Sequence, residues 1–144
     1  MTLSPEAVAA TQTALAAEHA AVWTYGLVSA FVSDADATTR GANAHRARRD
    51  TTARLLRDAG AEPQPPAAAY LPPEPVTDAA SSIAALVAVE ADACRAWHGV
   101  LERTDDTDLR RSALDALTES AVRATRWRKT GGITPVAVAL PGTS

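Results

Sequence analysis

Apolar residues recur at helical spacing in two segments of the first half of the chain. Ser4 as N-cap and Pro5 at the first helical position predict one helix from residue 5 to about 32. A second helix is predicted over 37–59 and is closed by Gly60. The expected inward stripe of the first helix is Val8, Thr11, Leu15, Glu18, Val22, Tyr25, Ser29 and Val32. The expected stripe of the second helix is His45, Arg49, Thr52, Leu56 and Ala59.

Two further helices are predicted in the second half, over 77–103 and 106–129. Their N-caps are expected to be Thr77 or Asp78 and Asp105 or Asp106, respectively. The third helix has one clear inward stripe, formed by Ile83, Val87, Glu90, Cys94, Trp97 and Leu101. The face of the fourth helix is less defined, because its leucines do not share a narrow stripe.

Residues 60–76 join the two pairs of helices and contain too many prolines to be helical. This connection is long for a compact domain and could span the length of a bundle. Two helical hairpins joined by a long crossover are a standard connectivity of four-helix bundles. We therefore predict one all-α domain over 1–144. Residues 130–144 are expected to form an apolar, non-helical tail that lies over the bundle or docks on a partner.

Composition narrows the class of protein. The chain of 144 residues is 47% hydrophobic but only 4% aromatic, which favours closely packed helices over a sheet. A net charge of -3 argues against nucleic-acid binding. No signal peptide is visible, and no run approaches the roughly 20 apolar residues of a membrane helix. The single cysteine, Cys94, excludes an internal disulfide, so we expect a cytoplasmic protein without membrane contact.

The two predicted hairpins have similar sequences. Aligning Glu18 with Glu90 pairs "EHAAVWTY" with "EADACRAW", and Tyr25 then matches Trp97. Aligning Arg49 with Arg123 pairs "ARRDTTAR" with "AVRATRWR". Together with the crossover, these matches indicate an internal duplication.

Four motifs carry a resemblance to a known family: "AEHAAVWTYG", "HRARRD", "PVTDAAS" and "RWRKTGGITPVAVALPG". On these motifs the chain resembles the ferritin-like superfamily, and more narrowly an uncharacterised ferritin-like family of high-GC, actinobacterial-type bacteria. The resemblance covers nearly the whole chain. It implies a ferritin-like four-helix bundle of two antiparallel helical hairpins, and it implies no particular activity.

In metal-binding ferritin-like proteins, each hairpin supplies one Glu and one Glu-x-x-His pair to two iron or manganese ions. The resemblance matches Glu18 and Glu90 to the single glutamates. The two pairs are incomplete, because Ala42 precedes His45 and Val122 follows Glu119 at the spacing where the partner should stand. At most four ligands remain: Glu18, His45, Glu90 and Glu119.

Two arginines favour a different interpretation of the same positions. Arg49 and Arg123 occupy equivalent places in the repeat, and a guanidinium stays charged and cannot bind a metal. We expect Glu18–Arg49 and Glu90–Arg123 ion pairs, or the cross-paired version, to replace the metal and close its site. His45 and Glu119 would join this buried polar network by hydrogen bonds, as could Tyr25. In the alternative interpretation without a functional site, Glu119 and Arg123 form an ordinary ion pair on the surface. The three tryptophans would then fill the core or an interface.

Three functions stay open at this stage. The first is a non-catalytic helical module that acts in binding or self-association, with no cofactor; the alanine-rich exterior and apolar tail would allow a homodimer. The alternative is a carboxylate-bridged diiron, dimanganese or mononuclear metal protein with oxidase or oxygen-scavenging activity. The third is a small-molecule binder that uses space between the helices. No nucleophile-base arrangement, phosphate loop or dinucleotide fingerprint is present, so no catalytic residue is assigned.

Overall fold

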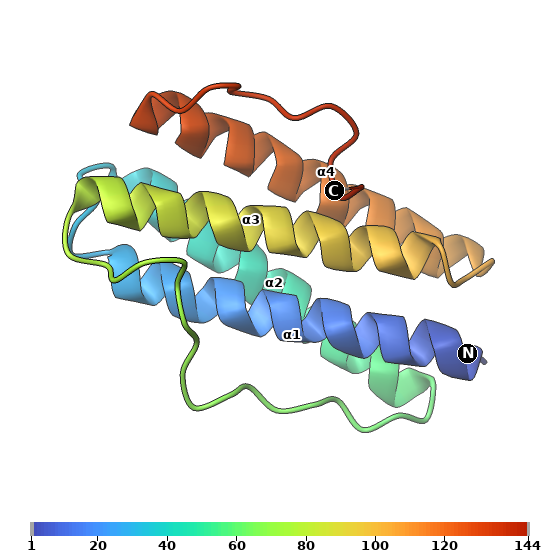
Figure 1. Ribbon diagram of the computed structural model, residues 1–144. Helices are drawn as coiled ribbons and strands as arrows, with labels where there is room; N and C mark the ends of the chain where they lie inside the picture. Colours follow the sequence, from blue (N-terminus) through green and yellow to red (C-terminus); the bar gives the residue numbers. More distant parts are fainter. Residues whose placement is uncertain (1, 144) are drawn as a thin grey trace.

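The computed structural model describes residues 2–143, which form four helices and no strand (Figure 1). The helices are α1 (Pro5–Val28), α2 (Ala35–Asp58), α3 (Ala79–Leu101) and α4 (Thr107–Gly131). Helix α3 packs against both α1 and α4, and α1 also packs against α2. The predicted all-α class is confirmed, and the arrangement is consistent with a four-helix bundle.

Each helix begins at a side chain that accepts a hydrogen bond from a backbone amide of its first turn. Ser4 caps α1, Asp34 caps α2, Asp78 caps α3 and Asp106 caps α4. In α3 the cap is reciprocal, because the Ser81 side chain also accepts from the Asp78 amide. The two open choices of cap are therefore settled in favour of Asp78 and Asp106.

Several helix boundaries differ from the sequence prediction by up to four residues, and the largest difference is at the end of α1. Helix α1 ends at Val28 rather than near Val32, because the chain tightens into a turn in which the Val28 carbonyl accepts from two later amides. Val32 stays buried all the same. Helix α4 continues to Gly131, and Gly132 then adopts a left-handed conformation with φ 64°. This is a glycine C-cap in which the Ile133 amide donates to the Arg128 carbonyl.

The inner face of α1 consists mainly of alanine. Ala7, Ala14 and Ala21 are fully buried, whereas the predicted stripe residues Val8 and Val22 are only partly buried. Small side chains let the neighbouring helices approach closely. The remaining core forms two apolar clusters, one around Trp97 and Leu109 and the other around Tyr25, Leu86 and Trp127. The candidate site lies between these clusters.

The proline-rich crossover between α2 and α3 runs back along α1 (Figure 1). The Gln12 side-chain amide donates to the Glu62 carbonyl at 2.8 Å and accepts from the Gln64 amide at 3.0 Å. Further along α1, the ring of Trp23 packs edge-on against Tyr70 with a centroid distance of 5.9 Å. Trp23 therefore serves to hold the crossover.

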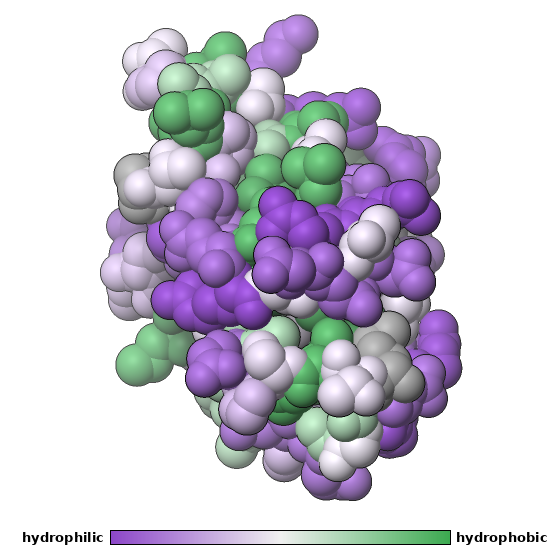
Figure 2. Space-filling view, turned by 90° about the vertical axis from the view of Figure 1, so that its right-hand side faces the viewer, coloured by the Kyte–Doolittle hydropathy of each residue, from purple (hydrophilic) through white to green (hydrophobic). Residues whose placement is uncertain are grey.

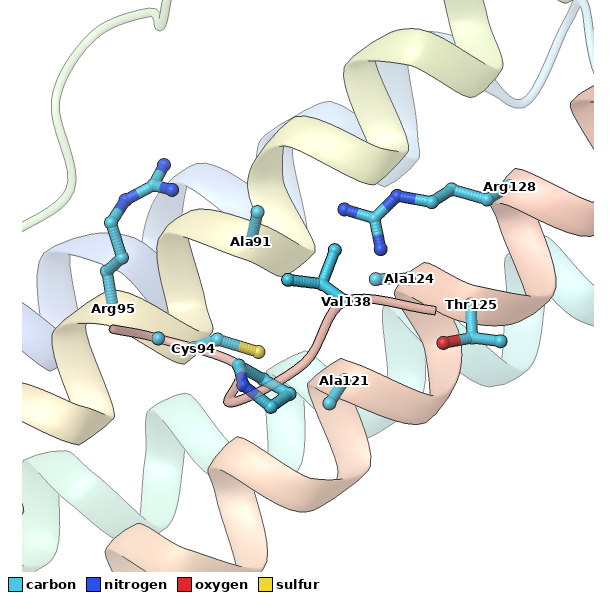
Figure 3. A pocket seen from close by; sticks show the side chains of 10 residues that line it. Ala91, Cys94, Arg95, Ala121, Ala124, Thr125, Arg128 and Val138 are labelled. Carbon is cyan, nitrogen blue, oxygen red and sulfur yellow. The ribbon is translucent and has the colours of Figure 1, made fainter. Parts of the chain in front are cut away.

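The C-terminal tail folds back over α3 and α4 (Figures 1 and 3). Gly142 lies directly against the Cys94 carbonyl, where a side chain would not fit. Between tail and helices is a small cavity of about 110 Å³, with Val138 of the tail above Cys94 and Arg128 beside it (Figure 3). Burial, together with the charge of Glu90, raises the pKa of the Cys94 thiol to about 11, so the thiol stays protonated.

Hydrophilic residues dominate the end of the molecule at which the N-terminus lies (Figure 2). The exposed large apolar residues elsewhere include Leu71 in the crossover and Leu140 in the tail. Within residues 2–143, none of the helices combines the length and apolar character that crossing a membrane requires.

Gly41 of α2 provides a first test of the packing. A methyl group at this position would overlap the Tyr25 ring, whose Cζ and hydroxyl atoms would lie at 2.5 and 2.7 Å. We therefore expect Gly41→Ala to lower the free energy of unfolding by about 1–3 kcal/mol. Gly26 of α1 is the matched control, because nothing lies within 4 Å of an added methyl group. Gly26→Ala should raise stability by about 0.5–1 kcal/mol. Urea unfolding measures both; equal stability of the two variants would contradict this packing.

Candidate functional site

Two glutamates lie at the centre of the bundle with almost no exposure to solvent. Glu18 of α1 is 1% exposed and Glu90 of α3 is 0% exposed. The inward stripes of their helices and the packing of α1 on α3 bring them together. An ionised carboxylate in such surroundings costs several kcal/mol unless donors compensate it. The partners of these two carboxylates therefore define the chemistry of the site.

His45 of α2 bridges the two glutamates. Its Nδ1 lies 2.5 Å from Oε2 of Glu18, and its Nε2 lies 2.8 Å from Oε1 of Glu90. A neutral imidazole has only one N–H and could donate to only one carboxylate. Bridging two ionised carboxylates requires both nitrogens to donate, so His45 is an imidazolium.

Three further side chains complete the surroundings of Glu90. Its Oε2 accepts from the Tyr25 hydroxyl at 2.6 Å and from Nε of Arg123 at 3.0 Å. Trp127 Nε1 in turn donates to the Tyr25 oxygen at 2.9 Å. Tyr25 can therefore donate to the carboxylate and accept from the indole at the same time.

The second oxygen of Glu18 is also occupied. Trp97 of α3 donates from Nε1 to Glu18 Oε1 at 2.8 Å. We call these side chains the central network: Glu18, Tyr25, His45, Glu90, Trp97, Arg123 and Trp127. All four helices contribute to it. The two carboxylates are balanced by one imidazolium and one guanidinium, so the network carries no net charge.

Burial and the neighbouring charges shift the pKa values of the network. Burial disfavours the imidazolium, but hydrogen bonds and charges from Glu18 and Glu90 outweigh it and raise the pKa of His45 from 6.5 to about 9. Burial likewise opposes ionisation of Glu90, but His45 and Arg123 hold its pKa below the usual value. For Tyr25, burial and the Glu90 charge both raise the pKa, so the phenol keeps its proton.

Five of the seven residues predicted for the polar network lie together at the centre: Glu18, Tyr25, His45, Glu90 and Arg123. The predicted Glu18–Arg49 pair does not form. Nε of Arg49 donates to Asp50 at 2.8 Å, and the side chain is 31% exposed. His45 and Trp97 face Glu18 instead, and each of them donates to one of its two oxygens.

Glu119 also lies outside the network. Its side chain is 52% exposed and accepts from Nη2 of Arg48 at 3.2 Å. The inner face of α4 passes through Ala116 and Ser120, which turns Glu119 outward. Neither the buried network nor the four-ligand alternative therefore includes this residue.

The sequence analysis missed the two tryptophans of the network. The signal for Trp97 was present in the repeat, which aligned it with Tyr25. In the structure these aromatic residues exchange partners: Tyr25 of α1 donates to Glu90 of α3, and Trp97 of α3 donates to Glu18 of α1. For Trp127 no comparable signal exists, because its partner is an aromatic hydroxyl and not a charge.

The donor set does not fit the metal centre that the ferritin-like resemblance suggests. A histidine binds a metal through an unprotonated nitrogen, whereas both nitrogens of His45 donate to carboxylates. All four oxygens of Glu18 and Glu90 accept from protein donors. Within residues 2–143, no buried side-chain nitrogen or oxygen lacks a hydrogen-bond partner that a ligand would have to supply.

The raised pKa of His45 predicts how stability depends on pH. The network contributes its full stabilisation below about pH 6.5 and loses it as the pH rises through about 9, since the folded protein binds the proton more tightly. The free energy of unfolding should fall by about 3 kcal/mol over this range. In His45→Gln the fall should be much smaller, because His19 and His98 are the only other histidines. Parallel pH profiles from urea unfolding would contradict the assignment.

The chain is similar to known proteins in both sequence and fold. The crystal structure of a conserved hypothetical protein from Mycobacterium tuberculosis is similar, with 38% sequence identity and a TM-score of 0.85. The similarity covers 94% of this chain and 97% of that chain. No curated protein matches the sequence. Residues 10–144 match the sequence model of a family described as a domain of unknown function (DUF4439), and the chain therefore belongs to this family.

Proposed function

We propose that this protein is a non-catalytic, ferritin-like helical module of two antiparallel hairpins, in which the central network takes the place of a metal centre. The module acts by binding a partner or by self-association, and it needs no cofactor. The observation that carries this proposal is the saturation of the network by protein donors. Glu18 and Glu90 satisfy every carboxylate oxygen within the chain, and His45 and Arg123 balance both charges.

The network supports this role by selecting one arrangement of the helices. Each helix supplies at least one member, so a shift of any helix by one residue would leave a buried charge without its partner. Removing one partner of a buried ion pair typically costs about 3–5 kcal/mol. A module held this firmly in register presents a fixed outer surface to a partner.

The outer surface offers apolar contacts for self-association. Leu114 and Val122 of α4 and Val136 and Leu140 of the tail are all exposed. An isologous dimer would bury such a face against its own copy. The lone buried Cys94 suits a reducing compartment, and we propose a cytoplasmic location.

Two glutamate variants separate the network from a metal site. Glu18→Ala removes one of the two carboxylates that face the His45 imidazolium, so the free energy of unfolding should fall by about 3–5 kcal/mol. Glu119→Ala is the matched control and should cost less than about 1 kcal/mol, because its pair with Arg48 is exposed. Urea unfolding measures both. Elemental analysis of protein produced with added iron and manganese should find well under one metal ion per chain.

The metal-protein alternative makes opposite predictions. It requires Glu119 to turn inward and His45 to release a proton. One or more tightly held metal ions per chain, lost in both Glu18→Ala and Glu119→Ala, would therefore overturn the proposal. So would a drop in the unfolding midpoint of the wild-type protein on addition of a chelator.

A further inference from the structure

A groove of about 370 Å³ lies between α2 and α4, on the side of the central network where Trp127 is found. Small-molecule sites typically enclose about 300–1,000 Å³. The buried or partly buried residues Gly41, Ala44 and Trp127 form an apolar floor. Three arginines border this floor: Arg40 from α2, and Arg123 and Arg126 from α4.

Glu90 balances the charge of Arg123, but the other two arginines of this groove have no ion pair with a described carboxylate. Within residues 2–143, the guanidinium groups of Arg40 and Arg126 form no hydrogen bond or ion pair. Arg123 uses Nε for Glu90 and directs no other nitrogen to a described acceptor. The one carboxylate on the rim, Asp34, accepts from the Ala37 amide as the cap of α2.

Helix stability explains these arginines only in part. Arg126 lies in the C-terminal part of α4, where a cation complements the helix dipole. Arg40 lies near the beginning of α2, toward the positive end of that helix, where a cation gains nothing from the dipole. Arg40 and Arg126 come from different helices and line the same groove, so one anionic group in the groove could contact both.

We propose that this groove binds a small organic anion that carries an aromatic ring, such as an aryl phosphate or aryl carboxylate. The ring would lie on the floor formed by Gly41, Ala44 and Trp127. The anionic group would face Arg40 and Arg126, whose planar guanidinium groups match the geometry of carboxylate and phosphate oxygens. This inference goes beyond the proposed function and does not depend on the absence of a metal.

Two residues of the central network, Arg123 and Trp127, also line the groove. Trp127 donates to Tyr25, and Arg123 donates to Glu90, so one floor residue and one wall residue are held by buried hydrogen bonds. A floor fixed in this way is preorganised for a ligand, which lowers the entropic cost of binding.

The test is an NMR titration of the full chain with phenyl phosphate, followed through backbone amide and indole N–H signals. We expect saturable shifts at Gly41, Ala44 and the Trp127 indole with a Kd below about 1 mM. Benzyl alcohol, which has the ring without the charge, and inorganic phosphate, which has the charge without the ring, should each bind at least about 10-fold more weakly, a difference of about 1.4 kcal/mol.

Paired variants locate the site. The double variant Arg40→Gln/Arg126→Gln should weaken phenyl phosphate binding at least about 10-fold. The control Arg46→Gln/Arg57→Gln removes the same charge from exposed positions of α2 outside the groove and should leave binding unchanged. The amide spectra of both variants report their folding directly.

Three outcomes would overturn the inference. The first is no saturable shift at the groove residues. The second is an equal loss of binding in both double variants, which would indicate non-specific attraction to positive charge. The third is binding of benzyl alcohol or inorganic phosphate as tight as that of phenyl phosphate, which would contradict a site for an aromatic anion.

Discussion

The imidazolium of His45 donates to Glu18 with one nitrogen and to Glu90 with the other, and this double hydrogen bond joins three of the four helices at the centre of the bundle. Two buried carboxylates side by side would repel each other. The shared cation turns that repulsion into an attraction that exists only when α1, α2 and α3 are all in register. Arg123 adds the second positive charge from α4 and makes the whole group neutral.

The rest of the structure excludes water from this network and holds its side chains at hydrogen-bond distance. Apolar clusters close the bundle on both sides of it. Alanines on α1 let the helices pack closely enough for side chains of the network to form hydrogen bonds between helices. Gly41 leaves room for the Tyr25 ring to reach Glu90. Trp127 extends the network to the floor of the groove between α2 and α4. Trp127 thus belongs both to the buried network and to the proposed binding groove.

Helical periodicity and capping residues predicted the four helices, and the inward stripes predicted that Glu18 and Glu90 are buried. Periodicity could not choose their partners. Arg49 lies one turn after His45 on nearly the same face of α2, and the spacing along the helix does not determine which of the two reaches Glu18. Glu119 was misplaced because the fourth helix is lined with small residues, which leave its inner face undefined in the sequence. Hydrogen bonds between helices, such as that of Trp97, depend on distances that spacing along one helix does not contain.

The most direct test of the central claim is the protonation state of His45, measured by nitrogen-15 NMR of the imidazole ring near pH 7. The account predicts that both ring nitrogens carry protons and that both protons are protected from exchange. Each N–H should also show a scalar coupling across its hydrogen bond, or a short interproton distance, to a different glutamate. A neutral ring with one unprotonated nitrogen at this pH would contradict it. The charge balance at the centre would then have to come from another source, such as a bound cation or a protonated glutamate.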